Sequence, residues 1–388
     1  MSKNNEKMRI LIIFNSLIGV IGGGSRHIVE VANRWIVSND IHYLISNEGY
    51  NVAVDHIGAP HENKKIIKYD VTFDSIRKFH LAYISRTVKS AYLCYKMRNE
   101  YDVVVAPNYL PQNIIPAIFM KSKKTKLVVY FHTTPLKERS KYLKSINVLK
   151  RNLSYLNWYF CTVVSERYFD LVFVINKSTK NYFVNRKVAS QKVEIISNAI
   201  PYQSIVSIKT PTIRKYDCVF LGRLVKSKGI LDIVKIWSIV TIDNPTAKIC
   251  ILGDGPDRDE LEKEIRKNSL ENNVFVYGQA ENDEKYRIMK DSNIFLYPSY
   301  YESQGIVILE ALACELTVVA YNLPTYNEFY DDYLNTVEVG DFQEMADLVK
   351  AIIKWPEKYR KQREDIKNFI SNYDWGVVSK NQELLLKR

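Results

Sequence analysis

Short runs of consecutive apolar residues alternate along this 388-residue chain with longer stretches whose apolar positions recur every three to four residues. The short runs are typical of strands buried on both faces, and the longer stretches are typical of amphipathic helices. Strands separated by helices of this length indicate parallel βαβ units. The predicted strands are residues 9–14, 41–46, 102–106, 126–131, 171–175, 193–196, 218–221, 248–252, 274–277 and 293–297.

The alternation is interrupted once, at residues 199–212, where two prolines occur without a clear period. We interpret this stretch as a linker between a domain at residues 1–198 and a domain at residues 213–370. Each domain is predicted to be a doubly wound, Rossmann-like α/β unit. Ligands of such sheets bind at the carboxyl ends of the strands. The loops predicted there are residues 15–24, 132–135, 222–229, 253–255 and 298–305.

Composition narrows the class of protein. Hydrophobic residues make up 46% and charged residues 25%, which is ordinary for a globular protein and argues against disorder. No apolar run approaches the ~20 residues of a membrane helix, and residues 1–14 lack the features of a signal peptide. The five cysteines are scattered, which favours reduced thiols. These features predict a cytoplasmic protein.

Charge is distributed unevenly between the two halves. Residues 1–210 hold 31 Lys and Arg against 14 Asp and Glu, whereas residues 211–388 hold 24 against 29. This asymmetry indicates two domains with different partners, although a solubilising surface bias would also produce it.

The most informative window is residues 292–320, which is predicted as strand, polar loop, helix and strand. The loop contains Glu302, Gly305 opens the helix, and Glu310 lies on it two turns further along. A helix N-terminus presents free N–H groups and a positive dipole end to a diphosphate, and carboxylates accept from sugar hydroxyls. The window therefore favours a nucleotide-sugar site, although two Glu at this spacing also occur by chance.

Four further motifs follow the predicted strands in order. They are the glycine run Gly22-Gly23-Gly24, the strand-end His132, the segment from Gly222 and Arg223 to Lys228, and the turn Gly253-Asp254-Gly255-Pro256. With the pair Glu302 and Glu310, this ordered set resembles the retaining glycosyltransferases of family 4 (glycosyl transferases group 1).

The resemblance spans roughly residues 9–320 and implies the GT-B fold, an α/β architecture of two Rossmann-like domains facing a central cleft. It implies an acceptor-binding first domain and a second domain that binds the nucleotide sugar. It also implies that the helix at residues 371–388 returns towards the first domain.

The resemblance implies a role for each motif residue. Arg223 and Lys228 contact the diphosphate, helped by the backbone N–H groups of Gly305, Ile306 and Val307. Glu310 binds the ribose hydroxyls, Glu302 the donor sugar, and His132 faces that sugar. Gly22, Gly23 and Gly24 allow the backbone to approach the phosphates or the acceptor closely. The resemblance also places Gly222, Gly253, Asp254 and Gly255 in the donor-binding site.

The implied reaction is a metal-independent hexosyl transfer with retention, in which the leaving phosphate helps to deprotonate the acceptor. No cofactor is expected, because a nucleotide sugar such as a UDP- or GDP-sugar is a substrate. No D-x-D metal motif occurs in a suitable loop. Catalytic roles are expected for His132, Glu302, Arg223 and Lys228.

Two departures from the family pattern affect local geometry. Gln304 replaces a common Phe, and Glu315 replaces a Gly that would adopt a left-handed conformation after the helix. We expect Glu315 to cost on the order of 1 kcal/mol at that position.

The acceptor is indicated only by residues 136–160, whose apolar positions form one helical stripe. Residues 137–151 carry six basic residues and one acidic residue. Such a segment suits an anionic lipid surface, but it also suits a core-facing helix with a basic outer face. With the basic first half, we favour peripheral contact with the cytoplasmic membrane face and a lipid-linked or other glycan acceptor in cell-envelope polysaccharide synthesis. The stripe consists of Tyr142, Ile146, Leu149, Leu153, Leu156 and Phe160.

Other functions stay open. A dehydrogenase could use Gly22–Gly24 and Glu48, but the run is not G-x-G-x-x-G and the later motifs would be unexplained. A nucleotide-sugar epimerase would share the fold and need no acceptor, and a non-catalytic scaffold would tolerate Gln304 and Glu315. Nucleic-acid binding lacks a recognition motif.

Overall fold

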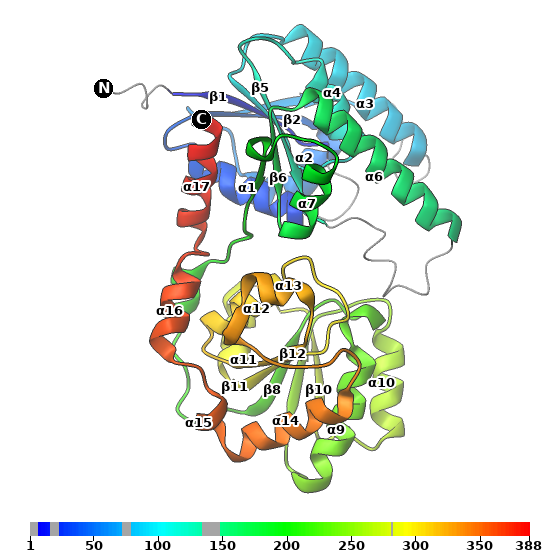
Figure 1. Cartoon of the computed structure of the whole chain (residues 1–388), viewed down its shortest axis with the longest axis vertical. Helices are drawn as coiled ribbons and strands as arrows, with labels where there is room; N and C mark the ends of the chain where they lie inside the picture. Colours follow the sequence, from blue (N-terminus) through cyan, green and yellow to red (C-terminus); the bar gives the residue numbers. More distant parts are fainter. Residues whose placement is uncertain (1–6, 16–22, 72–78, 134–147, 281) are drawn as a thin grey trace. The chain divides into compact units, whose positions relative to one another are not determined.

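The computed structural model describes residues 7–15, 23–71, 79–133, 148–280 and 282–388, which form two compact units (Figure 1). Unit 1 consists of Met1–Asn198 together with Trp375–Arg388, and unit 2 of Ala199–Asp374. Each unit contains one parallel sheet with helices on its faces, as the alternation of strands and helices predicts.

The sheet of unit 1 has seven parallel strands in the order β3-β2-β1-β4-β5-β6-β7. Chain order reverses direction at β1, which is the topology of a doubly wound fold. The strands are β1 (Arg9–Ile13), β2 (Asp40–Ser46), β3 (Lys64–Tyr69), β4 (Val103–Ala106), β5 (Lys126–Phe131), β6 (Leu171–Val174) and β7 (Val193–Ile195).

Helices cover both faces of this sheet. Because strand side chains alternate, Ile10 and Ile12 of β1 face one layer and Leu11 and Ile13 face the other. The first layer contains α1, α2 and α17, and the second contains α3, α4, α6 and α7. Their bounds are α1 (Gly23–Trp35), α2 (Asn47–Ile57), α3 (Phe79–Lys96), α4 (Pro111–Ile118), α6 (Val148–Tyr168), α7 (Lys177–Asn185) and α17 (Trp375–Lys387), with a 3-10 turn η1 (Ser190–Lys192).

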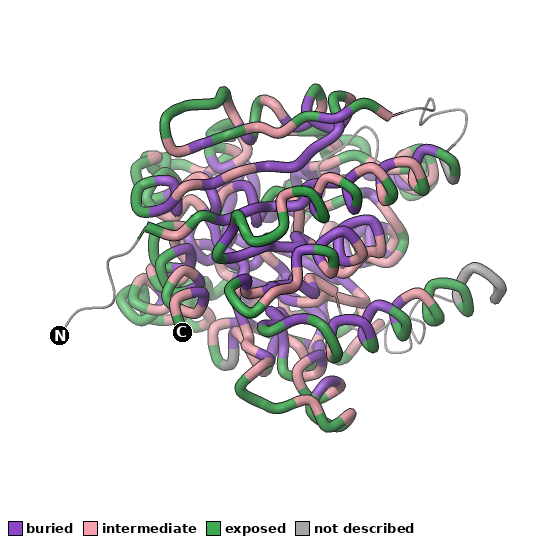
Figure 2. Tube along the Cα trace, turned by 90° about the horizontal axis from the view of Figure 1, so that it is seen from above, coloured by how far each residue is buried: buried purple, intermediate pink, exposed green. Residues whose placement is uncertain are grey.

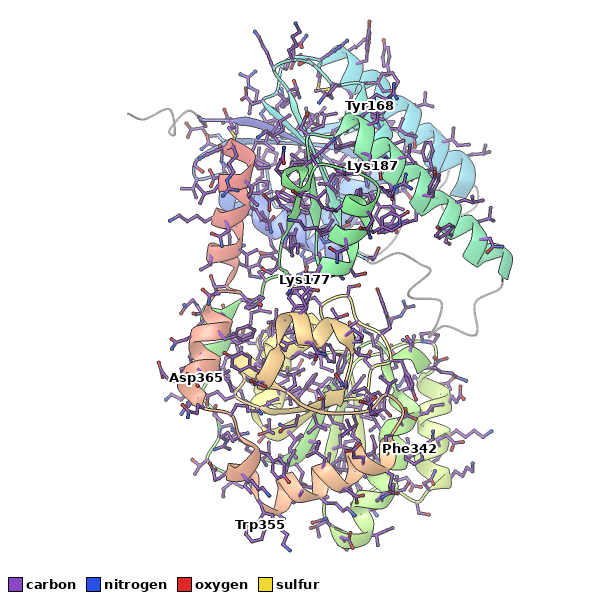
Figure 3. The ribbon with its side chains drawn as sticks, viewed as in Figure 1. Tyr168, Lys177, Lys187, Phe342, Trp355 and Asp365 are labelled. Carbon is purple, nitrogen blue, oxygen red and sulfur yellow. The ribbon has the colours of Figure 1, made fainter. Side chains whose placement is uncertain are left out.

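Unit 2 contains a parallel sheet in the order β10-β9-β8-β11-β12-β13, built around one buried apolar cluster. Phe342 and Trp355 mark the two ends of α14 in Figure 3. Its strands are β8 (Tyr216–Leu221), β9 (Ile249–Leu252), β10 (Val274–Gly278), β11 (Ser292–Tyr297), β12 (Thr317–Tyr321) and β13 (Asn335–Val337).

The helices of unit 2 surround that sheet and pack on its buried apolar cluster. Figure 2 shows the chain from above, with buried residues gathered in its interior and exposed residues on the outer turns. The helices of unit 2 are α8 (Tyr202–Ser207), α9 (Ile230–Asp243), α10 (Arg258–Lys267), α11 (Asn282–Lys290), α12 (Ile306–Ala313), α13 (Pro324–Phe329), α14 (Phe342–Lys354), α15 (Pro356–Tyr359) and α16 (Arg363–Ser371), with 3-10 turns η2 (Lys226–Lys228) and η3 (Asp331–Tyr333).

The ten predicted strands are confirmed to within two residues at either end. Six helices and strands were not predicted: α2, α4, α8, α13, β3 and β13. Strand β3 reads KKIIKY, so its apolar run is only two residues long, and β13 has three residues. Both lie at sheet edges, where only one neighbouring strand is needed and the apolar signal is weak.

The stretch expected to be a linker, residues 199–212, is in the structure the first part of unit 2. It contains helix α8, and the side chains of Ile200 and Ile205 are buried in the apolar cluster of that unit. The N–H of Ile200 donates to the carbonyl of Tyr373 at 2.9 Å. A six-residue helix has too few positions to show a period, so the pattern alone indicated only a break.

Helix α17 packs against α1 in unit 1, although the two are far apart in sequence. The indole Nε1 of Trp35 donates to the Ser379 carbonyl at 2.9 Å. The Tyr130 hydroxyl donates to Gln382 Oε1 at 2.9 Å, and Gln382 Nε2 lies 3.0 Å from His27 Nε2. The last helix therefore completes one face of the first sheet.

The apolar stripe predicted around residues 136–160 is solvent-exposed where the structure describes it. In α6, the side chains of Leu153, Leu156 and Phe160 are 57%, 60% and 48% exposed. The opposite face, with Trp158 and Cys161, packs on the sheet. Tyr142 and Ile146 lie outside the described residues. No helix among the described residues is long and apolar enough to cross a membrane.

Candidate functional site

Three loops meet at the carboxyl edge of the unit 2 sheet, after the neighbouring strands β9, β8 and β11. The N–H of Gly222 donates to the Leu252 carbonyl at 3.0 Å. Gly253 has φ of +132°, and a Cβ on it would lie 1.9 Å from the Gly222 carbonyl oxygen. Only glycine allows the loops after β8 and β9 to approach this closely.

The loops after β8 and β11 approach each other in the same way. Gly229 has φ of +71°, and a Cβ there would lie 1.9 Å from the carbonyl oxygen of Pro298. The N–H of Tyr300 donates to the Ser227 carbonyl at 3.0 Å. This contact holds the turn η2 against the loop after β11 and brings Lys228 next to Glu302.

Glu302 is the centre of a compact polar cluster. Its Oε1 accepts from Lys228 Nζ, from the Tyr297 hydroxyl at 2.5 Å and from Ser299 Oγ at 3.1 Å. Burial raises the pKa of Tyr297 well above its usual value, so the phenol stays protonated and donates. The side chain of Glu302 is 11% exposed. The donors hold the carboxylate in one orientation at the edge of the sheet.

Gly305 separates this cluster from helix α12. It has φ of +82° and immediately precedes the helix, whose first N–H groups have no acceptor within the helix. The Tyr330 hydroxyl donates to the Gly305 carbonyl at 2.9 Å, which fixes the start of the helix. The N–H groups of Ile306 and Val307 thus lie at a positive helix end beside Glu302.

Glu310 is buried in the second turn of α12. Its Oε1 accepts from Lys285 Nζ at 2.7 Å and from the Tyr286 hydroxyl at 2.9 Å. Both donors come from α11, and sequence reasoning missed them. No local spacing links Lys285 and Glu310, because they lie 25 residues apart on two helices that are separated by β11.

Arg223 differs from the two lysines. It is exposed, it directly follows Gly222, and it makes no ion pair or side-chain hydrogen bond with any residue that the structure describes. Asp254 is held locally, since its Oδ1 accepts from the Gly255 N–H at 2.8 Å. A Cβ on Gly255 would lie 2.4 Å from the Leu224 carbonyl oxygen. The turn after β9 therefore supports the backbone that carries Arg223.

In unit 1, the glycine run lies beside the predicted histidine. Gly22 lies outside the described residues, whereas Gly23 and Gly24 begin α1. A Cβ on Gly24 would lie 2.6 Å from Cδ2 of His132. The structure therefore brings the glycine run and His132 together, and Gly24 leaves room for the imidazole.

His132 and His27 form an aromatic cluster with Tyr130. The two imidazoles have centroids 5.4 Å apart, and the His132 ring stacks on Tyr130 at 5.5 Å. Burial lowers the pKa of His132 to about 4. The Pro107 carbonyl partly offsets this shift, although it does not form a hydrogen bond with the imidazole. Burial and the neighbouring His132 lower the pKa of His27 to about 3. Both rings are neutral at pH 7.

Sequence reasoning missed His27 and Gln382 as parts of this cluster. His27 lies in the motif that the sequence analysis selected for its glycines. Gln382 lies 355 residues after His27, on α17. Among the described residues, no three metal-ligating side chains come together.

Both halves of the chain match models of known glycosyltransferase families. A sequence model of Glycosyl transferases group 1 matches residues 208–369, and one of Glycosyltransferase Family 4 matches residues 21–203. Two uncharacterized glycosyltransferases of Methanocaldococcus jannaschii are each 25% identical. One alignment covers 99% of both chains, and the other covers 66% of this chain and 64% of the relative.

Another relative, from Campylobacter jejuni, has a name that specifies its reaction. It is an N-acetylgalactosamine-N,N'-diacetylbacillosaminyl-diphospho-undecaprenol 4-alpha-N-acetylgalactosaminyltransferase, 28% identical over 68% of each chain. Among solved structures, Anabaena HepE in complex with UDP and glucose superimposes with a TM-score of 0.74. That alignment covers 98% of this chain and 99% of HepE at 18% identity, which shows a shared fold.

The contact between Gly229 and Pro298 yields a first prediction. Gly229→Ala should destabilise unit 2 by at least about 2 kcal/mol more than Gly340→Ala does, because the added Cβ forces two backbones apart. Gly340 is the matched control, since it also has positive φ (+90°) and a Cβ there meets nothing within 4 Å. Urea unfolding followed by tryptophan fluorescence measures both. Equal losses would contradict the close contact.

The buried His27 yields a second prediction, on pH. The unfolded histidine takes up a proton near pH 6.5, whereas His27 in the folded chain does so only near pH 3. Stability should therefore fall as the pH drops below 6.5, by about 2 kcal/mol at pH 5 from this residue. Denaturant unfolding from pH 7 to pH 5 measures this loss.

The control for this experiment is a pair of single variants. His27→Gln should reduce the pH dependence of stability, whereas His56→Gln, at an exposed position of α2, should leave it unchanged. The same pH dependence in both variants would show that His27 is not the group responsible.

Proposed function

Because this chain belongs to the glycosyl transferases group 1 family and has the GT-B fold, we propose that it moves a sugar from a nucleotide-sugar donor to an acceptor hydroxyl. The observation that carries the proposal is the cluster at the carboxyl edge of unit 2. There the ion pair of Lys228 with Glu302 lies beside the helix start at Gly305 and close along the chain to the exposed Arg223.

The donor diphosphate is proposed to bind at this helix start. The N–H groups of Ile306 and Val307 and the positive end of α12 favour an anion there. Arg223 has no competing partner among the described residues, so its guanidinium is available to a phosphate. Lys228 shares its charge between Glu302 and the leaving diphosphate, whose negative charge grows as the bond to the sugar breaks.

The two carboxylates are proposed to recognise hydroxyl groups. Glu302 is held by three donors on Oε1, and it accepts from the transferred sugar. Glu310 is oriented by Lys285 and Tyr286, and it accepts from the ribose. We assign His132 a hydrogen bond to the transferred sugar, because a neutral imidazole can both donate and accept.

We further propose that transfer proceeds with retention and without a metal ion. The acceptor oxygen bonds to the anomeric carbon on the face from which the diphosphate leaves, and the acceptor proton passes to a phosphate oxygen of that group. This step needs cations at the diphosphate rather than a carboxylate base. Arg223, Lys228 and the α12 N-terminus supply that charge.

The acceptor is proposed to be a glycan or lipid-linked sugar of cell-envelope polysaccharide or glycoconjugate synthesis. The undecaprenol-diphosphate named for the Campylobacter jejuni relative supports a lipid-linked class. The exposed apolar side chains of α3 and α6 support contact with an anionic membrane surface. These side chains are Ile84, Val88, Tyr92, Tyr95, Leu153, Leu156 and Phe160.

A thermal-shift screen against UDP-, GDP- and ADP-sugars, with EDTA present, tests the donor proposal first. Stabilisation by one nucleotide-sugar class is expected, followed by nucleotide release that depends on an added glycan acceptor. Conversion of the sugar without any acceptor would identify an epimerase instead. Binding without turnover would identify a scaffold. Proton NMR of the first product then compares its anomeric configuration with that of the donor.

Lys228→Ala provides a direct test of the site. It should lower kcat/KM at least about tenfold, because ~1.4 kcal/mol of lost transition-state contact suffices. Lys226→Ala is the matched control. Lys226 lies in the same 3-10 turn but pairs with Glu260 in an exposed ion pair at 2.8 Å, so activity should change less than about twofold. Equal activity of both variants would remove Lys228 from the site.

Membrane contact is tested by sedimentation with vesicles of phosphatidylglycerol or phosphatidylcholine. The double variant Val88→Asp and Tyr92→Asp should weaken binding to the anionic vesicles at least about tenfold, since two apolar contacts are lost. Ile242→Asp is the control, because Ile242 is an apolar side chain of unit 2 that is 75% exposed. This variant should bind the vesicles as tightly as the parent chain does. Unchanged binding of the double variant would exclude α3 from the contact.

A further inference from the structure

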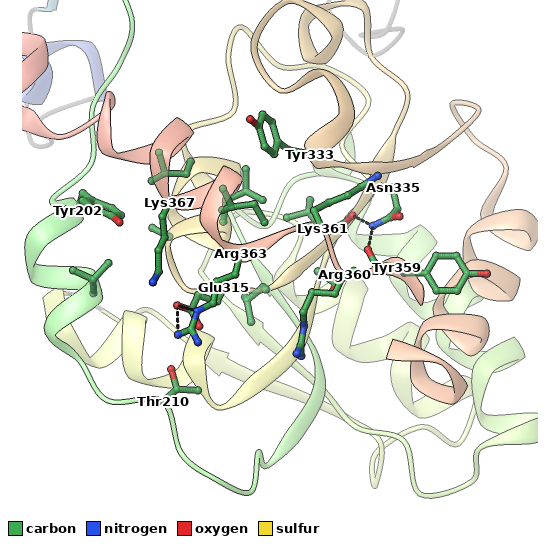
Figure 4. Close-up of a pocket in the computed structure, with 18 of the residues that line it drawn as sticks. Tyr202, Thr210, Glu315, Tyr333, Asn335, Tyr359, Arg360, Lys361, Arg363 and Lys367 are labelled. Atoms are coloured by element: carbon green, nitrogen blue, oxygen red, sulfur yellow. Dashed lines mark hydrogen bonds and ion pairs between the residues drawn. The ribbon is translucent and has the colours of Figure 1, made fainter. Parts of the chain in front are cut away.

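A second recess in unit 2 lies away from the cluster around Glu302. It has a volume of about 270 Å³ and lies where α12 ends and β12 begins, at the amino edge of the sheet (Figure 4). The proposed donor site lies at the carboxyl edge. None of the residues assigned to the donor lines this recess.

The charged lining of the recess is strongly unbalanced. Five cationic side chains face one carboxylate, that of Glu315. Glu315 Oε1 lies 2.5 Å from Nη2 of Arg363, so it offsets one positive charge. Lys361 has no ion pair with any residue that the structure describes. The cations are Arg214, Arg360, Lys361, Arg363 and Lys367.

The remaining acidic partners lie at the rim. Arg360 pairs with Glu357 at 3.1 Å, but that carboxylate is 79% exposed. Lys367 lies 4.0 Å from Glu364, which is 77% exposed. Ion pairs with such exposed carboxylates are weak. They leave the positive potential of the recess largely uncompensated.

Arg214 shows how close these cations are to one another. Burial and the neighbouring Arg360 lower the pKa of Arg214, against the opposing effect of Glu315. Its Nη1 donates to the Ser292 carbonyl at 2.5 Å, which holds the guanidinium in place. Several like charges kept together in a partly buried recess are typical of an anion site.

Glu315 itself occupies a strained position. As the sequence predicted, it is left-handed, with φ of +61°, and it follows the end of α12. The N–H of Leu316 donates to the Ala311 carbonyl at 3.1 Å, so the turn closes the helix as a glycine would. The conformation is strained for a residue that has a side chain, yet it places a carboxylate among the cations.

Apart from Thr210, Thr317 and Asn335, the rest of the lining is aromatic and apolar. Tyr202, Tyr333 and Tyr359 contribute to the walls, and Leu316, Ile366 and Ile370 add apolar surface (Figure 4 labels the tyrosines). An inorganic anion alone would leave this surface in contact with water. The lining therefore suits a ligand that has an apolar or planar part beside its negative charge.

We propose that this recess binds a small phosphorylated ligand with a planar or apolar part, at a site separate from the donor. The guanidinium groups of Arg214, Arg360 and Arg363 suit phosphate oxygens, since each presents paired N–H donors. The carboxylate of Glu315 lies beside these cations and competes with the ligand phosphate. A free metabolite and a phospholipid headgroup share this chemistry, and the small volume of the recess, about 270 Å³, favours the free metabolite.

Isothermal titration of the full chain with uridine monophosphate and with inorganic pyrophosphate tests the site. Arg223→Ala with Lys228→Ala first weakens the donor site, so that the remaining binding reports on the recess. In this background, adding Lys361→Ala and Arg363→Ala should weaken the remaining binding at least about tenfold. Adding Glu315→Gln should tighten it, because the competing carboxylate is gone.

Lys263→Ala is the control for the loss of an exposed lysine, since this residue is exposed on α10 and is not among the lining residues. It should change the affinity less than about twofold. Equal weakening by Lys263→Ala, or loss of all binding in the starting background, would overturn the proposal. If the donor assignment is wrong instead, the variant with Arg223→Ala and Lys228→Ala still binds the probe at two sites. Adding Lys361→Ala and Arg363→Ala then removes only the binding at the recess.

Vesicles containing phosphatidic acid separate the two sources of phosphate. Binding of the soluble probes that depends on Arg363 supports the free metabolite. A different result would overturn the free metabolite in favour of a lipid headgroup. In that result the chain binds the vesicles but not the soluble probes, and Lys361→Ala with Arg363→Ala abolishes the vesicle binding.

Discussion

The candidate donor site depends on the close approach of three backbone loops at one edge of a parallel sheet. Gly253 and Gly229 each come so near to a neighbouring carbonyl that a single Cβ would lie 1.9 Å from it. These contacts convert three separate strand ends into one rigid surface. Lys228 and Glu302, 74 residues apart in the sequence, become partners because of them.

Each carboxylate of this surface is paired with a lysine and a tyrosine. Lys228 and Tyr297 hold Glu302, and Lys285 and Tyr286 hold Glu310. Removing a carboxylate from water is costly unless donors replace the lost water, which these groups do. Two oriented carboxylates suit hydroxyl recognition, while Arg223 and the α12 N-terminus remain for a negatively charged group.

Unit 1 achieves a similar local order with neutral groups. His27 and His132 are buried in contact with each other, and Gln382 of the last helix bonds to both His27 and Tyr130. Burial keeps both imidazoles uncharged, so they avoid mutual repulsion and stay available for hydrogen bonding. A helix from the C-terminus thus completes a cluster that begins at the first glycine motif.

The sequence by itself determined the two parallel sheets, because apolar runs buried on both faces leave a strong local signal. It also located Glu302 in a loop after a strand and Gly305 at the start of a helix, since strand-end loops and helix starts favour particular residue types. Only the tertiary structure decided that Lys285 would hold Glu310 and that Gln382 would reach His27, because helix packing has no counterpart in local spacing. Likewise, only folding brought Arg214 and the cations of residues 360–367 together around Glu315, since these three parts of the recess are far apart in sequence.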